Sequence, residues 1–248
     1  MLSTTETYNL IQSRKGQIAV LIDPDKSNKP EQINSLIEKA EFAEVDFFFV
    51  GGSTVTRNQF EFVVSYLKEN SNIPIVLFPG ASHQISKEAD ALLYLSLISG
   101  RNPDFLIGHH VQSADEVYDM EIEVIPTAYI LIDGGTKSSV AYVSQTTPIP
   151  SDKLSIILNT AKAGILQGKK IIYVDAGSGA LNHVPDNVIQ ELNQLKQPII
   201  VGGGIRSISE IESLKESGAN VIVIGNKIEE DIDFLLDIKL VTNKKWKS

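Results

Sequence analysis

The chain of 248 residues contains no cysteine at all. Disulfide bonds, thiolate zinc sites and thiol nucleophiles are therefore excluded from its chemistry. A chain without disulfides fits a reducing compartment, and the cytoplasm is the location that we expect.

Long hydrophobic runs are also missing. No stretch approaches the roughly 20 apolar residues that a membrane span needs. The opening segment, MLSTTETYNLIQSRKG, has no apolar core of the kind found in secretory signals. We therefore expect neither a membrane span nor a signal peptide.

Positive charge is scarce relative to negative charge. The sequence has 22 Lys and Arg against 31 Asp and Glu, which gives a net charge of −9 and a pI near 5.0. An acidic chain is a poor binder of nucleic-acid backbones, so no nucleic-acid partner is expected. The charge leaves room for a small anionic substrate in a local pocket.

The sequence does contain a series of short apolar runs. Eight of them are predicted strands, at residues 17–23, 46–52, 73–80, 91–99, 124–133, 170–177, 198–205 and 220–226. Their near-continuous apolar character is typical of parallel strands covered on both faces. Eight such strands with helices between them predict an α/β fold, a single (β/α)8 TIM barrel that forms one domain over residues 1–248.

Helical periodicity fills most of the intervals between these runs. Apolar residues recur three and four positions apart over residues 33–40, 60–67, 154–161 and 188–195. Ser207 and Glu210 have the spacing of a capping box, and a last helix is expected from near Asp231.

Two connecting segments depart from this pattern. The third link, ASHQISKEAD (residues 81–90), is too short for a covering helix. It predicts a short or irregular third crossover, with a groove beside it on the outside of the barrel. The link after the fifth strand (residues 134–150) is long and polar, and we expect a flexible lid there.

Glycines gather at the ends of the sixth, seventh and eighth predicted strands. Barrel enzymes place their chemistry at these ends, and the loops after strands seven and eight are the usual phosphate site. Bare backbone N–H groups bind phosphate oxygens. We therefore predict that Gly203, Gly204, Gly225 and Asn226 hold a phosphate, the alternative for each glycine being a tight turn alone.

Asp175 ends the sixth predicted strand, beside these glycines. Because a carboxylate repels phosphate, its expected partner is a hydroxyl of the same ligand, from which it would accept a proton. Tyr173 lies on the same face of that strand and either lines the pocket or packs in the barrel core. Ser178 is not in a G-x-S-x-G elbow, which favours a phosphate contact over a nucleophile.

Asp23 and Ser53 lie across the barrel, at the ends of the first and second predicted strands. A carboxylate and a hydroxyl on adjacent strand ends suit Mg²⁺, which takes one or two protein oxygens together with phosphate and water. A turn Asp and a helix-capping Ser are the alternatives for each residue alone. Asp25 and Lys26 are expected to pair with each other.

Five motifs occur in order along the chain: LIDPDK, FVGGST, YVDAGSGA, VGGGIRS and VIVIGN. With SLISGRNPDFLIG after the fourth predicted strand, they resemble the geranylgeranylglyceryl phosphate synthase family of prenyltransferases over nearly the whole chain. The AGSGA form is similar to the archaeal-like branch of that family.

This resemblance implies an ether-forming transfer with Mg²⁺ as cofactor. A polyprenyl diphosphate, commonly geranylgeranyl diphosphate, would alkylate the 3-hydroxyl of sn-glycerol 1-phosphate and release diphosphate. Asp23 and Ser53 match the metal positions, and Asp175 and Tyr173 would be catalytic. The glycerol phosphate positions match Tyr173, Val174, Asp175, Ala176, Gly177, Ser178, Gly179, Gly203, Gly204, Gly225 and Asn226.

The family also implies a homo-oligomer, either a dimer or a hexamer. The groove beside the third link would take the hydrocarbon tail, and its candidate neighbours are Phe78, Leu92 and Tyr94, with core packing as the alternative for each. Two positions depart from the family's pattern. Asp175 stands where the family usually has Glu, whose side chain is one carbon longer. Leu21 stands where some members carry a phosphate-binding Lys.

Two other hypotheses stay open. The first is a different phosphate-binding barrel enzyme, an isomerase or lyase acting on a phosphorylated metabolite. The second is a non-catalytic binder of such a metabolite. Asp23, Ser53 and Asp175 speak against simple binding, because a binder needs no metal opposite the phosphate.

Overall fold

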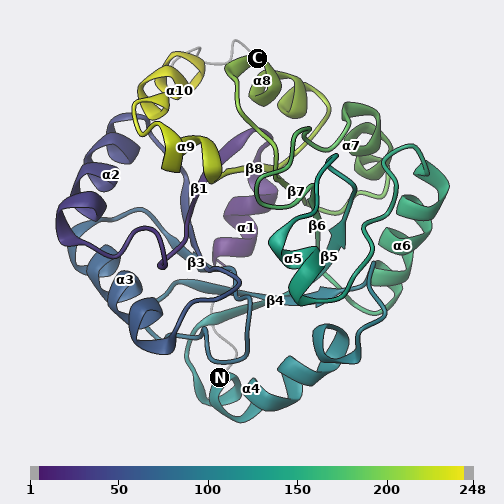
Figure 1. Cartoon of the computed structure of the whole chain (residues 1–248), viewed down its shortest axis with the longest axis horizontal. Helices are drawn as coiled ribbons and strands as arrows, with labels where there is room; N and C mark the ends of the chain where they lie inside the picture. The colour runs from purple at the N-terminus through teal and green to yellow at the C-terminus, as the bar shows by residue number, and fades with distance from the viewer. Residues whose placement is uncertain (1–5, 243–248) are drawn as a thin grey trace.

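A computed structural model describes residues 6–242, which form one closed barrel of eight parallel strands (Figure 1). The strands are β1 (Gln17–Ile22), β2 (Phe47–Val50), β3 (Ile75–Leu77), β4 (Ala91–Leu97), β5 (Glu123–Leu131), β6 (Ile171–Asp175), β7 (Ile199–Gly202) and β8 (Val221–Ile224). Each strand pairs with its neighbour in chain order, and β8 closes onto β1. The predicted TIM barrel is confirmed; residues 1–5 and 243–248 of the predicted domain lie outside the described part.

Alternate residues of each strand face the barrel interior and the surrounding helices. On β6, Tyr173 belongs to the apolar cluster inside the barrel, whereas Val174 packs in the cluster between strands and helices. Both residues are almost fully buried. Burial on two faces explains why the strands read as continuous apolar runs.

The covering helices form the outer ring in Figure 1. They are α2 (Pro30–Phe42), α3 (Arg57–Asn70), α4 (His109–Asp119), α6 (Leu154–Leu166), α7 (Asp186–Asn193), α8 (Ile208–Glu216) and α10 (Phe234–Thr242). The predicted capping box begins α8, with Ser207 Oγ accepting from the Glu210 amide at 3.3 Å and the Glu210 carboxylate accepting from the Ser207 amide at 2.9 Å. Every helix between residues 6 and 242 is too short or too polar to cross a membrane.

The last helix begins at Phe234 rather than near Asp231. The Asp231 carboxylate accepts a hydrogen bond from the Asp233 amide at 3.2 Å, a local turn that competes with helix. A five-residue helix, α9 (Asn226–Glu230), precedes this turn directly after β8.

The third crossover is irregular, as predicted. Residues 78–90 between β3 and β4 contain no helix, so a loop occupies the place of a covering helix between α3 and α4 in the outer ring (Figure 1). Gln84 fixes this loop from a fully buried position. Its amide donates to the Gly52 carbonyl at 2.7 Å and accepts from the Gly80 amide at 2.9 Å, so the loop is held against the ends of β2 and β3.

The end of the barrel that carries the strands' N-termini is covered by a helix that the sequence patterns did not reveal. Helix α1 (Glu6–Ser13) places Ile11, fully buried, in the interior cluster. The Glu123 carboxylate, at the start of β5, accepts from the amides of Thr7 at 2.7 Å and Tyr8 at 3.1 Å. A carboxylate at a helix N-terminus satisfies free amides and complements the helix dipole.

The link after β5, for which the sequence predicts a flexible lid, contains regular structure. It contains helix α5 (Ser139–Val143), capped by the Ser138 side chain, which accepts from the Ala141 amide at 3.3 Å. Ile149 then pairs with Ile132 in an isolated bridge beside β5. Buried Ala141 and Ile149 anchor this part of the link to the barrel, and the flexibility of the link stays a prediction.

Candidate active site

A cavity of about 750 Å³ opens at the C-terminal ends of the strands. Its walls bring together nine of the predicted site residues: Asp23, Ser53, Tyr173, Asp175, Ser178, Gly203, Gly204, Gly225 and Asn226. Strand ends that are far apart in sequence therefore meet around one space, as the barrel prediction required.

Four predicted glycerol phosphate positions do not line this cavity: Val174, Ala176, Gly177 and Gly179. Val174 and Ala176 are buried in the outer apolar cluster. The amide of Gly177 donates to Asp175 Oδ1 at 2.7 Å, and the amide of Gly179 donates to Asn226 Oδ1 at 2.9 Å. In this structure Val174 is part of β6, the other three residues build the loop after it, and contact of all four with a ligand stays a prediction.

Asp175 is almost fully buried and both of its carboxylate oxygens accept hydrogen bonds. Oδ1 accepts from the Gly177 amide, and Oδ2 accepts from the Tyr129 hydroxyl at 2.5 Å. Burial raises the pKa of Asp175, while the hydrogen bonds from Tyr129 and Gly177 lower it less. A carboxylate with a raised pKa is a stronger base, which suits proton removal from a hydroxyl.

Three aromatic rings form the wall below this carboxylate. The ring of Phe78 lies 4.9 Å from that of Tyr173 and 5.8 Å from that of Tyr129. Tyr129 and Tyr173 are paired across β5 and β6, with their rings 5.4 Å apart and nearly perpendicular. Packed rings offer both a rigid apolar surface and the negative faces that attract a cationic carbon.

Gly203 and Gly204, which follow β7, lie so close to other parts of the chain that neither position has room for a side chain. A Cβ on Gly203 would lie 2.5 Å from the Gly177 nitrogen, and a Cβ on Gly204 would lie 2.4 Å from the Asn182 carbonyl oxygen. Both glycines also have φ values in the left-handed region, +81° and +72°. The tight-turn alternative therefore accounts for these two residues on its own. Both line the cavity, and phosphate binding by their amides stays a prediction.

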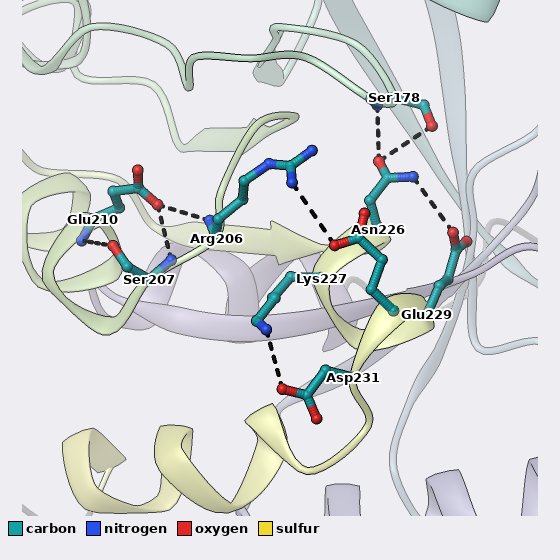
Figure 2. A network of polar contacts seen from close by, with 10 residues as sticks. Ser178, Arg206, Ser207, Glu210, Asn226, Lys227, Glu229 and Asp231 are labelled. Carbon is teal, nitrogen blue, oxygen red and sulfur yellow. Dashed lines mark hydrogen bonds and ion pairs between the residues drawn. The ribbon is translucent and has the colours of Figure 1, made fainter.

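Asn226 joins the end of β8 to the loop after β6 (Figure 2). Its Oδ1 accepts from the Gly179 amide at 2.9 Å and from Ser178 Oγ at 3.2 Å, while its Nδ2 donates to Glu229 at 3.4 Å. Asn226 is also the first residue of α9. A short extra helix after the last strand is the common phosphate-binding element of TIM barrels.

Asp23 fits a hard cation. It is half-buried, and burial raises its pKa, while the hydrogen bond from the Asp25 amide and the charge of Lys26 lower that pKa by less. Oδ1 accepts from the Asp25 amide at 3.1 Å, whereas Oδ2 has no hydrogen bond within residues 6–242. Ser53, at the adjacent strand end, lines the same cavity.

The protein supplies few metal ligands at this point. In the described part of the chain, no three His, Asp or Glu side chains converge on a possible metal position. An ion held by Asp23 and Ser53 would take its other oxygens from water and from a phosphate, which is how Mg²⁺ is usually bound.

Lys26 does not pair with Asp25, so that prediction was wrong. Its ammonium lies 2.7 Å from Glu229 on α9, and Asp25 instead accepts from Thr54 Oγ1 at 2.5 Å. The pairing with Glu229 crosses from β1 to the end of β8, a contact between elements 203 positions apart that local sequence cannot indicate.

The cavity continues into a groove on the outer face of β4. Leu92 and Tyr94, which face outward on β4, line it with Ile85 of the third link and Ser113 of α4. The groove exists because loop rather than helix covers this part of the barrel. All three candidate neighbours of a hydrocarbon tail, Phe78, Leu92 and Tyr94, line the continuous cavity.

Helix packing fixes the far side of this groove. A π-helical turn, η1 (Asp104–Gly108), leads into α4, and Phe105 and His109 from this segment meet edge to face at 4.9 Å. His110 stacks on Tyr94 at 4.1 Å, and its Nε2 lies 2.6 Å from the Leu95 carbonyl oxygen. The two adjacent histidines therefore pack in different directions and form no metal pair with each other.

Sequence reasoning missed two residues of the site. Tyr129 holds Asp175, and Glu229 links Lys26 to Asn226. The period-two pattern of β5 places Tyr129 inside the barrel, but only the strand register shows that its hydroxyl reaches the end of β6.

The chain matches the PcrB family over residues 9–243. It is 48% identical over 236 residues to a geranylgeranylglyceryl phosphate synthase of Chitinophaga pinensis, covering 93% of each chain. It is 40% identical over 212 residues to a protein of the same name from Pyrococcus furiosus, covering 85% of this chain and 83% of the relative.

Solved structures agree with the sequence comparison. The crystal structure of (S)-3-O-geranylgeranylglyceryl phosphate synthase from Thermoplasma acidophilum in complex with its substrate sn-glycerol-1-phosphate is similar with a TM-score of 0.89 and 32% identity, over 98% of both chains. The tryptophan synthase alpha-subunit of Pyrococcus furiosus, with a TM-score of 0.56 at 12% identity, is similar in fold alone. This chain belongs to the PcrB family, among the geranylgeranylglyceryl phosphate synthases.

Proposed function

We propose that this protein transfers a geranylgeranyl group from geranylgeranyl diphosphate to the 3-hydroxyl of sn-glycerol 1-phosphate. The observation that carries the proposal is the position of Asp175. This buried carboxylate lies between the glycine-rich ends of β6 to β8 and a cavity that continues as the groove over β4. The names of the relatives support the same reaction, and the Thermoplasma acidophilum protein binds sn-glycerol-1-phosphate.

The reaction breaks the allylic C–O bond of the prenyl diphosphate and forms an ether C–O bond. The diphosphate leaves with the bonding electron pair, and positive charge develops on the prenyl carbon. The glycerol hydroxyl attacks this carbon and loses its proton to the base at Asp175. The faces of Tyr173, Tyr129 and Phe78 would stabilise the developing cation.

Mg²⁺ is part of the proposal, held by Asp23 and Ser53. When bound, such an ion would neutralise charge on the diphosphate leaving group. Asp23 and Asp175 both line the cavity, from β1 and β6 respectively. This arrangement would place the leaving group and the attacking hydroxyl on different sides of the reacting carbon.

The groove over β4 would bind the hydrocarbon tail. Burying each methylene contributes about 0.8 kcal/mol, so an apolar groove several residues long gives strong selectivity for a long chain. Leu92, Tyr94 and Ile85 supply its walls. A homo-oligomer and a cytoplasmic location are also expected, and both stay predictions.

The test is product analysis with purified protein, Mg²⁺, sn-glycerol 1-phosphate and labelled prenyl diphosphates of increasing length. We expect prenyl ether and diphosphate only when both substrates are present, with geranylgeranyl diphosphate preferred. Parallel reactions with sn-glycerol 3-phosphate and with EDTA serve as controls. Turnover of a phosphosugar without a prenyl donor would instead favour the isomerase or lyase hypothesis, and tight binding without turnover would favour a non-catalytic binder.

A further inference from the structure

We propose that the Tyr129 hydroxyl is a catalytic group that carries the proton from the substrate hydroxyl to Asp175. The inference rests on the proposed function and adds a residue to it. Its basis is one contact: the Tyr129 hydroxyl lies 2.5 Å from Asp175 Oδ2, and both residues line the cavity.

Asp175 faces the cavity beside a fixed hydroxyl group. Asp175 and Tyr129 are similarly buried, at 7% and 5% exposed, and the carboxylate oxygens accept one hydrogen bond each, Oδ1 from Gly177 and Oδ2 from Tyr129. Its side chain has a single methylene, and the Gly177 amide holds it back against its own loop. A substrate hydroxyl that approaches Oδ2 from the cavity meets the Tyr129 hydroxyl bound to that oxygen, and the Tyr129 oxygen can accept the substrate's proton.

Tyr129 is held in the position that a relay needs. It lies on β5 opposite Tyr173, two residues before the pair Leu131–Asp175, so its side chain extends toward the end of β6. Contacts with the rings of Phe78 and Tyr173 restrict its side-chain freedom. A donor fixed by packing loses little entropy when it binds a substrate oxygen.

The proton balance of the step is simple. As the glycerol oxygen bonds to the prenyl carbon, its proton moves to the Tyr129 oxygen, and the Tyr129 proton moves to Asp175 Oδ2. Tyr129 is a neutral phenol before and after the step, and Asp175 ends protonated. Burial raises the pKa of Tyr129 well above its usual value, and the charge of Asp175 adds to the rise. A free phenolate is therefore disfavoured, and the two transfers must be concerted.

The test compares Tyr129→Phe, Asp175→Glu and the double variant with the wild-type protein. We expect Tyr129→Phe to lower the single-turnover rate by about 10²-fold, the usual contribution of a proton-transferring group. Glycerol phosphate affinity, measured by calorimetry without prenyl donor, should fall less than about tenfold, because only one hydrogen bond to the substrate is lost. In the double variant the glutamate is longer by one carbon–carbon bond, about 1.5 Å, and should recover at least tenfold of the lost rate.

Rescue by the longer carboxylate separates a relay from a structural role, because a packing defect left by Tyr129→Phe would persist in the double variant. Should the double variant unfold, the solvent deuterium isotope effect on the single-turnover rate is the second test. We expect an effect of two transferred protons in the wild type and of one in Tyr129→Phe. An unchanged rate in Tyr129→Phe, or an equal isotope effect in both proteins, overturns the inference alone. A wild-type protein that makes no prenyl ether overturns the proposed function, and the inference with it.

Discussion

A Cβ on Gly203 would lie 2.6 Å from Oδ1 of Asp175. The backbone at the end of β7 therefore borders the predicted base directly, and no side chain separates the predicted phosphate site from it. This contact joins the two halves of the predicted site, the amides expected to bind a phosphate and the buried carboxylate expected to bind a hydroxyl.

Substituting Gly203→Ala should weaken glycerol phosphate binding by at least about tenfold, because the new methyl would push against Asp175 and the Gly177 amide. The left-handed backbone adds strain of about 1–3 kcal/mol. The matched control is Gly168→Ala, which has a similar φ of +84° but no atom within 4 Å of the new methyl. Calorimetry on both variants is the measurement, and equal affinities would show that the contact at Gly203 is irrelevant to binding.

Asp175→Asn should lower the rate of ether formation by about 10²- to 10⁴-fold, since it removes the general base. The same substitution should raise the stability of the folded protein at neutral pH. Burial raises the folded-state pKa of Asp175 above 3.8, so the folded protein loses stability as pH rises through the raised pKa and the group ionises.

The variant should therefore unfold at a higher temperature than the wild type at pH 7, and the gain should vanish near pH 4. Thermal unfolding at both pH values checks this. An unchanged rate, or a variant less stable than the wild type at pH 7 alone, would contradict the assigned environment of this carboxylate.

Asp23→Asn should abolish the stabilisation of the protein by Mg²⁺ in the presence of inorganic diphosphate, measured as a thermal shift. Because burial raises the pKa of Asp23, the wild-type response should weaken as pH falls toward that pKa. Asp25→Asn is the control, since that carboxylate binds Thr54 at the rim. A full Mg²⁺ response in Asp23→Asn would place the ion elsewhere.

Asn226→Ala should raise the dissociation constant for glycerol phosphate about tenfold. The change removes the acceptor that orders Gly179 and Ser178, and each lost hydrogen bond costs about 1 kcal/mol. Lys227→Ala is the neighbouring control on α9, because that side chain pairs with Asp231 at 3.0 Å, away from the loop (Figure 2). If both variants bind equally well, the bridge at Asn226 has no part in the site.

The barrel could be predicted from sequence because its signals are local. Each strand is a run of apolar residues, and the capping box of α8 is two residues three positions apart. The absence of a covering helix between β3 and β4 was also predicted, because the ten residues of that link are too few to form one. Helix α1 was not, because the burial of Ile11 inside the barrel and the cap from Glu123 both depend on residues distant in sequence.

The positions that line the cavity could be predicted from sequence where they lie at the C-terminal end of a strand. Six of the predicted residues meet at one cavity because every parallel strand ends on the same side: Asp23, Ser53, Asp175, Gly203, Gly204 and Gly225. Tyr129 and the Lys26–Glu229 pair escaped prediction, since each depends on register and side-chain reach across the barrel. Such contacts leave no period in the sequence.

The most direct measurement is a crystal structure of the protein soaked with sn-glycerol 1-phosphate. We predict that the phosphate lies against the amides at Ser178, Gly203, Gly204 and Gly225, with the 3-hydroxyl within hydrogen-bond distance of Tyr129 or Asp175. A ligand bound anywhere else, or a phosphate at these amides with its glycerol pointing away from Asp175, would contradict this prediction.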